Sequence, residues 1–208
     1  MKELQKYGIS LSGEQVDKLQ KYARRVLQWN NYVNLTGAKD VKAFFTKHIE
    51  DCLSVIPFFS LKRNIIDVGS GCGLPGLILA ISIPEAKIFA VEPLAKRHRF
   101  LNQVKIELEI NNFVPINSRI QTFAFSDNST KTTEKPILVS RAFGKTKSFV
   151  DACKGFIDDG CEAYLMKSDL ENGERQYLSQ FDQFVIHNLE NSSFEKRLLV
   201  SFKSKLNS

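Results

Sequence analysis

A glycine-rich stretch from Gly69 to Gly76 limits the possible folds of this chain more than any other feature. Four glycines fall within these eight residues, directly after an apolar segment that ends in Asp67-Val68. Only glycine lets the backbone turn sharply and leaves no Cβ between the backbone and a ligand. The stretch therefore predicts a strand, a tight turn that can approach a ligand, and a helix that begins near Pro75.

The segments around this turn predict an α/β fold. Ile65–Val68 and Ala86–Glu92 are mostly apolar runs on either side of the short helix, which indicates a βαβ unit. A helix over 95–108 follows. Strands that alternate with helices predict a doubly wound, seven-stranded and mainly parallel sheet. The five further strands are expected at 113–117, 137–140, 163–167, 184–186 and 198–202, with a surface loop over 125–135.

Helical patterns precede the first strand. Ser12 followed by Gln15 is a capping box, and an apolar stripe continues to Asn30. A second helix is expected from Asp40 to the stop at Pro57. We therefore expect residues 1–60 to form a helical extension that packs on a core of residues 61–208, as one compact unit. A length of 208 residues suits such a unit.

Composition limits the cellular location and the binding partners that can be expected. The formal net charge of +6 permits a polyanionic partner. The N-terminus carries no apolar signal segment and no apolar run is long enough to span a bilayer, so we expect a cytoplasmic protein without a membrane partner. The cysteines show no C-x-x-C spacing and the three histidines are scattered, so no metal site is predicted. The cysteines are Cys52, Cys72, Cys153 and Cys161.

Two cofactors compete for the glycine turn. Gly71-x-Gly73-x-x-Gly76 matches the dinucleotide fingerprint, with Glu92 placed to hold ribose hydroxyls. Asp67-x-Gly69-x-Gly71-x-Gly73 matches the loop of S-adenosylmethionine-dependent methyltransferases equally well. A dinucleotide needs free N–H groups for its pyrophosphate, and Pro75 removes one of them. S-adenosyl-L-methionine carries an ammonium group that suits Asp67, directly or through water, and is the favoured cofactor.

Several motifs resemble those of the bacterial small-subunit ribosomal RNA guanine-N7 methyltransferase family, also called glucose-inhibited division protein B. The resemblance covers nearly the whole chain, and the Gly-Leu-Pro-Gly and Ser-Arg-Ala-Phe blocks are its distinctive parts. The matching pieces are Trp29-Asn30, Tyr32-x-Asn34-Leu35-Thr36, His48-Ile49-x-Asp51-x-Leu53, Ile66 to Gly76, Lys96-Arg97-x-x-Phe100-Leu101, Ser140-Arg141-Ala142-Phe143 and Lys167.

The resemblance implies a Rossmann-like class I methyltransferase that modifies N7 of a specific guanine in 16S ribosomal RNA, in the 530-loop region. Its partner is ribosomal RNA or the small ribosomal subunit, and we expect a monomer. Gln121 departs from the family pattern, which has Glu there. The implied cofactor contacts are Gly69, Leu74, Ile120, Gln121 and Arg141, the implied catalytic residues are Arg141 and Lys167, and the pocket rim holds Asn34, His48 and Asp51.

Guanine N7 explains why no general base is evident. Its lone pair points out of the ring and no proton leaves, so catalysis rests on holding donor and acceptor in line. The N7 edge is inaccessible within an A-form helix, so the target guanine has to lie in a loop or be turned out of its stack. Arginine ordinarily binds both O6 and N7 of guanine. Because N7 has to stay free, we expect Arg141 or Lys167 to contact O6 or a phosphate.

Basic residues form the expected RNA contacts. Lys96, Arg97 and Arg99 fall in the first turn of their helix, where the helix dipole disfavours cations. RNA phosphates or a neighbouring acid such as Glu92 can compensate them, and the pattern does not decide between the two. His48 and Asp51 can contact each other across one helical turn, as a structural or a functional pair. Arg119, Lys196 and Arg197 complete the RNA-binding set. A nicotinamide-dependent oxidoreductase and a non-catalytic RNA-binding module remain as alternatives.

Overall fold

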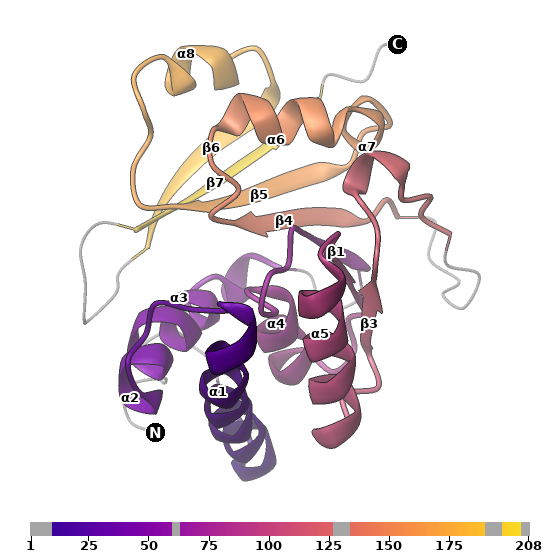
Figure 1. Cartoon of the computed structure of the whole chain (residues 1–208). Coiled ribbons are helices and arrows are strands. Elements are labelled where there is room, and N and C mark those ends of the chain that lie inside the picture. The colour runs from indigo at the N-terminus through magenta and orange to yellow at the C-terminus, as the bar shows by residue number, and fades with distance from the viewer. Residues whose placement is uncertain (1–9, 60–62, 127–133, 190–196, 205–208) are drawn as a thin grey trace.

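The computed structural model describes residues 10–59, 63–126, 134–189 and 197–204. Its centre is one seven-stranded sheet in the order β3-β2-β1-β4-β5-β7-β6 (Figure 1). Strands β1 to β5 are parallel, and β7 runs antiparallel to both β5 and β6. The α/β fold with a mainly parallel sheet is confirmed. The strands are β1 (Ile65–Val68), β2 (Ile88–Val91), β3 (Phe113–Ile116), β4 (Ile137–Arg141), β5 (Glu162–Lys167), β6 (Asp182–Leu189) and β7 (Arg197–Lys203).

Helices cover both faces of the sheet (Figure 1). Side chains alternate along a strand, so Ile65 packs with one group of helices and Ile66 with the other. This double burial explains why the parallel strands read as continuous apolar runs. One face carries α1 (Gly13–Val33), α2 (Val41–Phe44), α3 (Glu50–Leu53), α4 (Gly76–Ser82) and α5 (Ala95–Glu107), and the other carries α6 (Thr146–Ala152), α7 (Lys154–Asp158) and α8 (Glu174–Leu178).

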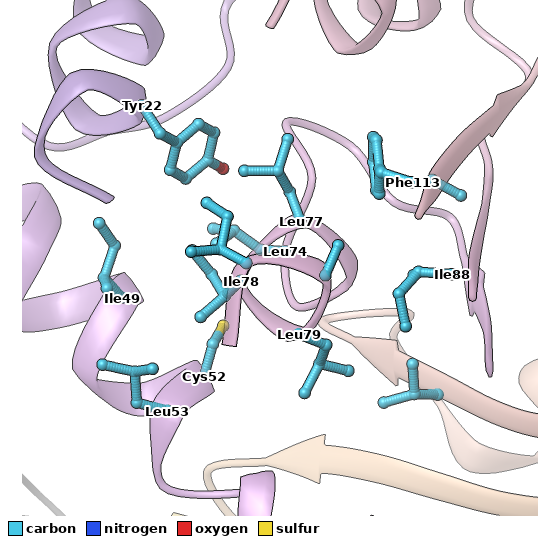
Figure 2. Packing of buried hydrophobic residues seen from close by; sticks show 14 of the residues in the cluster. Tyr22, Ile49, Cys52, Leu53, Leu74, Leu77, Ile78, Leu79, Ile88 and Phe113 are labelled. Carbon is cyan, nitrogen blue, oxygen red and sulfur yellow. The ribbon is translucent and has the colours of Figure 1, made fainter. Parts of the chain in front are cut away.

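The first helix begins where the sequence predicts. Ser12 Oγ accepts the backbone N–H of Gln15 at 3.1 Å, and Gln15 Oε1 accepts the backbone N–H of Ser12 at 2.8 Å, which confirms the capping box. The helix continues past Asn30 and ends at Val33, with Asn34 in the left-handed region at φ 48°. Figure 2 shows Tyr22 of α1 beside Leu77 and Ile78 of α4. The extension and the sheet domain therefore share one core.

The second predicted helix is not continuous. Asp40 caps α2, but a π-helical segment, η2 (Phe45–Ile49), separates α2 from α3, and a 3-10 turn, η3 (Ile56–Phe58), follows. An apolar stripe cannot distinguish the two hydrogen-bond patterns, so the sequence does not reveal this segment. π-helical turns within α-helices are frequent at functional sites.

The remaining predictions of elements differ in detail. The short helices α6, α7 and α8 were not predicted, whereas β6 is longer than the expected 184–186. The central part of the predicted loop over 125–135 lies outside the described residues, and its described ends carry no helix or strand. Among the helices that the structure describes, none has the length and apolar character needed to cross a bilayer.

Candidate functional site

The glycine turn connects β1 to α4 and is closed on its own backbone. Gly69 N–H and Ser70 N–H both donate to Val91 O, at 2.9 and 3.2 Å, and Gly71 N–H donates to Glu92 Oε2 at 2.9 Å. Gly73 N–H and Leu74 N–H both donate to Ser70 O. A pyrophosphate requires several free amides at this position. Because these amides are already bonded, the turn does not fit a dinucleotide.

Asp67 stabilises the turn through hydrogen bonds. Its carboxylate is fully buried, and Oδ2 accepts Ser70 Oγ–H at 2.5 Å and Gly76 N–H at 3.0 Å. Oδ1 is buried and has no hydrogen-bond partner among the residues that the structure describes. Burial raises the pKa of Asp67, and the hydrogen bonds from Ser70 and Gly76 offset this only in part, so the pKa is about 7. The orphaned oxygen fits a cationic donor such as the ammonium group of S-adenosylmethionine, directly or through water.

Glu92 holds two neighbouring backbone segments. It follows β2, is 2% exposed, and accepts Gly71 N–H through Oε2 and Leu94 N–H through Oε1, the latter at 2.8 Å. Within the described residues, the space beside Gly71 is free of other atoms, because a Cβ placed on Gly71 would have Gly69 O, at 3.9 Å, as its nearest neighbour. A ligand can therefore approach the turn beside Glu92. The ribose contact of Glu92 stays a prediction.

A charged cluster joins the extension to the carboxyl ends of the central strands. Arg141, the last residue of β4, donates from Nε to Asp51 Oδ2 at 2.9 Å and from Nη2 to His48 Nδ1 at 2.9 Å. Arg197 Nε of β7 lies 3.3 Å from the other oxygen of Asp51. His48 and Asp51 thus bind Arg141, and not each other as their spacing suggested. One buried carboxylate is shared by two guanidinium groups.

The protonation state of His48 follows from this geometry. A guanidinium group can only donate, so His48 Nδ1 has to be the unprotonated acceptor. Nε2 then carries the hydrogen and lies 3.2 Å from Thr36 Oγ1. Burial and the positive charge of Arg141 lower the pKa of His48 to about 4. His48 is therefore neutral at pH 7.

A cavity of about 670 Å³ opens beside this cluster, and His48, Asp51, Arg141 and Arg197 all line it. It lies at the carboxyl ends of β4 and β5, where ligands bind in doubly wound sheets. Asn34, the third predicted rim residue, caps α1 and is not among the lining residues.

Phe143 separates the glycine turn from this cavity. Its ring lines the cavity, and its Cδ2 lies 3.5 Å from the position that a Cβ on Gly69 would take. Phe149 packs edge-on against the ring, with 5.4 Å between centroids. The preceding Ala142 has a φ of 60°, which turns the chain sharply between Arg141 and Phe143. The ring thus offers an apolar wall between the two halves of the site.

Lys167, the last residue of β5, is bonded within the protein. Its Nζ donates to Glu174 Oε1 at 2.7 Å and to Thr146 Oγ1 and Gly144 O at 3.2 Å each. Burial raises the pKa of Glu174, but the hydrogen bonds from Lys167, Thr146 and the Glu171 amide outweigh it and lower the pKa to about 2. In this structure Lys167 ties α8 to the turn after β4. Its contact with substrate stays a prediction.

The predicted RNA contacts fall into two groups. Among the described residues, Lys96, Arg97 and Arg99 have no ion-pair partner, and the Glu92 carboxylate is occupied by backbone amides. The neighbouring-acid alternative is therefore not what the structure shows. Arg119 is exposed after β3, next to β2 in the sheet. Arg197, in contrast, lies in the cavity wall, and Lys196 is outside the described residues.

The predicted adenine contacts lie on a 3-10 turn, η4 (Ile120–Thr122), after β3. Ile120 is buried and Gln121 is exposed. Both line a second cavity of about 410 Å³ together with Phe123 and Phe156, and no sequence pattern predicted this cavity. Their contact with the cofactor stays a prediction. In the described parts of the chain no group of three or more His, Cys, Asp or Glu side chains could hold a metal ion.

Solved structures share this fold. The chain is similar to an S-adenosylmethionine-dependent methyltransferase from Aquifex aeolicus, with a TM-score of 0.53 and 14% identity over 77% of this chain and 92% of that one. The seven-stranded sheet with helices is the Rossmann-like fold of S-adenosylmethionine-dependent methyltransferases. The model of the rRNA small subunit methyltransferase G family matches residues 15–200, and the chain belongs to this family.

Curated relatives agree. The chain is 36% identical to the ribosomal RNA small subunit methyltransferase G of Azoarcus sp. over 148 residues, which are 70% of this chain and 66% of the relative. It is 35% identical to that of Salmonella arizonae over 173 residues, which are 82% of this chain and 79% of the relative. The resemblance inferred from the sequence motifs is thereby confirmed.

Proposed function

We propose that this protein transfers the methyl group of S-adenosylmethionine to N7 of a guanine in small-subunit ribosomal RNA, in the 530-loop region. The observation that carries this proposal is the state of His48, Asp51 and Lys167, three ionisable groups of the predicted site that lie at the large cavity. His48 is neutral with its acceptor nitrogen bonded to Arg141, Asp51 is ion-paired, and the Lys167 ammonium is bonded to Glu174. None of these three is free to remove a proton, and N7 requires no proton to be removed.

Arg141 has a donor left for the acceptor base. Its Nε and Nη2 are bonded to Asp51 and His48, whereas Nη1 has no partner in the part of the chain that the structure describes. A single donor can bind guanine O6 and leave N7 open, which a bidentate arginine cannot do. The two existing bonds fix the guanidinium plane, so Arg141 can position the base without competing for the reacting atom.

The unpaired cations favour an RNA partner. Three cations that are unpaired in the described part of the chain lie near the N-terminus of α5, next to the glycine turn: Lys96, Arg97 and Arg99. Arg119 follows β3, the strand beside β2 in the sheet. Phosphates would compensate their unfavourable place at the helix N-terminus. The names of the relatives support ribosomal RNA as the substrate. A ribosomal RNA substrate fits a cytoplasmic enzyme, and we further propose that it acts as a monomer.

A modified substrate tests the reaction. Small-subunit RNA in which the target guanine is replaced by 7-deazaguanine lacks the proposed acceptor atom and keeps O6 and the Watson–Crick edge. We expect it to bind like unmodified RNA and to incorporate no methyl group from radiolabelled S-adenosylmethionine. Incorporation at the rate of the unmodified RNA would show that another atom is the acceptor.

Thermal unfolding tests the class independently. S-adenosylhomocysteine at about a hundred times its Kd adds roughly 2.7 kcal/mol to the free energy of unfolding, so the Tm should rise. NAD and NADP should leave the Tm unchanged, because the amides of the glycine turn are already bonded. Stabilisation by NAD alone would contradict a methyltransferase and favour the oxidoreductase alternative.

A further inference from the structure

Tyr22 connects the N-terminal extension to the glycine turn. Its hydroxyl donates to the backbone oxygen of Cys72 at 2.8 Å, and both residues are buried, with no exposed surface on Tyr22. Figure 2 shows the ring reaching from α1 toward Leu74 and Leu77, with its oxygen at the near end. The fold therefore brings a polar group of the extension into contact with the centre of the cofactor loop.

The peptide that Tyr22 contacts lies between two glycines of the turn. Cys72 lies between Gly71 and Gly73, which have φ values of 60° and 103°. Glycines on both sides let the intervening peptides rotate at small cost. The carbonyl of Cys72 and the N–H of Gly73 share one rigid peptide plane, and that N–H donates to Ser70 O at 2.7 Å. Holding the Cys72 carbonyl therefore fixes both sides of this peptide.

A second hydrogen bond from α1, made by Gln15, can be compared with that of Tyr22. Gln15 Nε2 donates to Ile81 O at 2.7 Å, close to the end of α4. Tyr22 and Gln15 thus bind the segments before and at the end of the same helix. Only the Tyr22 contact involves the glycine turn, so the two contacts separate an effect on the cofactor loop from an effect on the packing of α1.

We propose that Tyr22 is a positioning residue for S-adenosylmethionine, which acts by holding the Cys72–Gly73 peptide in the orientation that the cofactor requires. The extension is then a part of the cofactor site and not only a cover for the sheet. The rival interpretation is that Tyr22 contributes only to the core, where its ring packs edge-on against Phe44 with 5.7 Å between centroids. The two interpretations predict different effects of removing the hydroxyl.

The test uses Tyr22→Phe in the full chain, which removes one oxygen and keeps the ring. We expect its Kd for S-adenosylhomocysteine, measured by calorimetry, to rise about tenfold, because the buried Cys72 carbonyl loses the hydrogen bond from Tyr22. At saturating RNA the KM for S-adenosylmethionine should rise more than kcat falls. Hydrogen exchange at the Gly73 amide should become faster in the absence of ligand.

Gln15→Ala is the matched control. It removes the contact at the far end of α4, so the Tm should fall while the Kd for S-adenosylhomocysteine stays within about twofold of the wild-type value. If Tyr22→Phe binds S-adenosylhomocysteine as tightly as the wild type, or if both variants lose affinity equally, Tyr22 has no positioning role and the proposal is wrong. Both results are independent of the RNA target, so they do not depend on the proposed acceptor atom.

Discussion

Arg141 and Asp51 form an ion pair of 2.9 Å that joins two segments 90 residues apart in the sequence. The side chain of Asp51 is only 4% exposed and that of Arg141 is 17% exposed. Arg197 reaches the same carboxylate from β7. Helix α3 of the extension therefore supplies the negative charge that holds two strands of the sheet at the cavity.

Asp51→Asn should destabilise the protein strongly, because it leaves two partly buried guanidinium groups without their counter-charge. Breaking such a pair costs about 3–5 kcal/mol, which urea unfolding would measure as a lower midpoint. Asp151→Asn is the control, since its exposed pair with Lys147 contributes about 0–1 kcal/mol. Equal losses in the two variants would contradict the proposed importance of the buried cluster.

Arg141→Lys should lower the methylation rate on the order of a hundredfold, the usual cost of a lost positioning group, while the protein stays folded. Lysine keeps the positive charge beside Asp51 but cannot also bind His48 and the acceptor base. Arg63→Lys is the comparison. Arg63 pairs with Glu162 at an N–O distance of 3.0 Å, and it does not line the cavity. A single-turnover assay with bound cofactor measures the effect. An unchanged rate would remove Arg141 from the catalytic residues.

Gly76→Ala should destabilise the glycine turn. A Cβ at this position would lie 2.5 Å from Asp67 Oδ2, so the buried carboxylate has to move, at a cost of about 1–3 kcal/mol. Gly155→Ala in α7 is the opposite case, because nothing lies within 4 Å of its Cβ and alanine favours a helix by about 0.5–1 kcal/mol. Thermal unfolding of both variants should therefore show shifts of opposite sign, and shifts of the same sign would contradict this account.

As the pH drops from about 6.5 to about 4, Asp67, whose pKa is raised from 3.8 to about 7 in the folded protein, should stabilise the fold, and His48 should destabilise it. The pKa of His48 is lowered from 6.5 to about 4 in the folded protein, so the unfolded chain binds this proton first. In His48→Asn the amide oxygen can still accept from Arg141 but does not titrate. The Tm of this variant relative to that of the wild type should therefore rise as the pH drops through this window. Parallel Tm profiles would show that His48 does not contribute.

Single replacements of Lys96, Arg97 or Arg99 by alanine should each reduce the salt slope of RNA binding by about 1 and leave the affinity for S-adenosylhomocysteine nearly unchanged. Each lost cation removes one phosphate contact and its counterion release. Lys147→Ala is the control, because Lys147 is already paired with Asp151. Filter binding at several salt concentrations gives the slopes. Three slopes equal to that of Lys147→Ala would place these residues outside the RNA interface.

The sequence predicted those features whose signals are local. The cap at Ser12, the strand before Asp67 and the turn at Gly69 each depend on neighbouring residues, and each lies where expected. The bond from Lys167 to Glu174 was missed because neither residue carries a pattern that points to the other. Tyr22 could have been found, since it lies three residues after Leu19 and four before Val26 on the buried stripe of α1.

The position of β7 in the sheet determines when the cavity can form as the chain is synthesised. This strand is the last described along the chain, yet it lies between β5 and β6 in the sheet and supplies Arg197 to Asp51. During synthesis Asp51 leaves the ribosome long before Arg197, and β5 keeps an open edge until β7 emerges. A chain broken off before β7 would leave this edge of the sheet unpaired and Asp51 with Arg141 as its one described guanidinium partner. Only chains that include β7 would then have the complete cavity wall, because Arg197 and Leu198 line it.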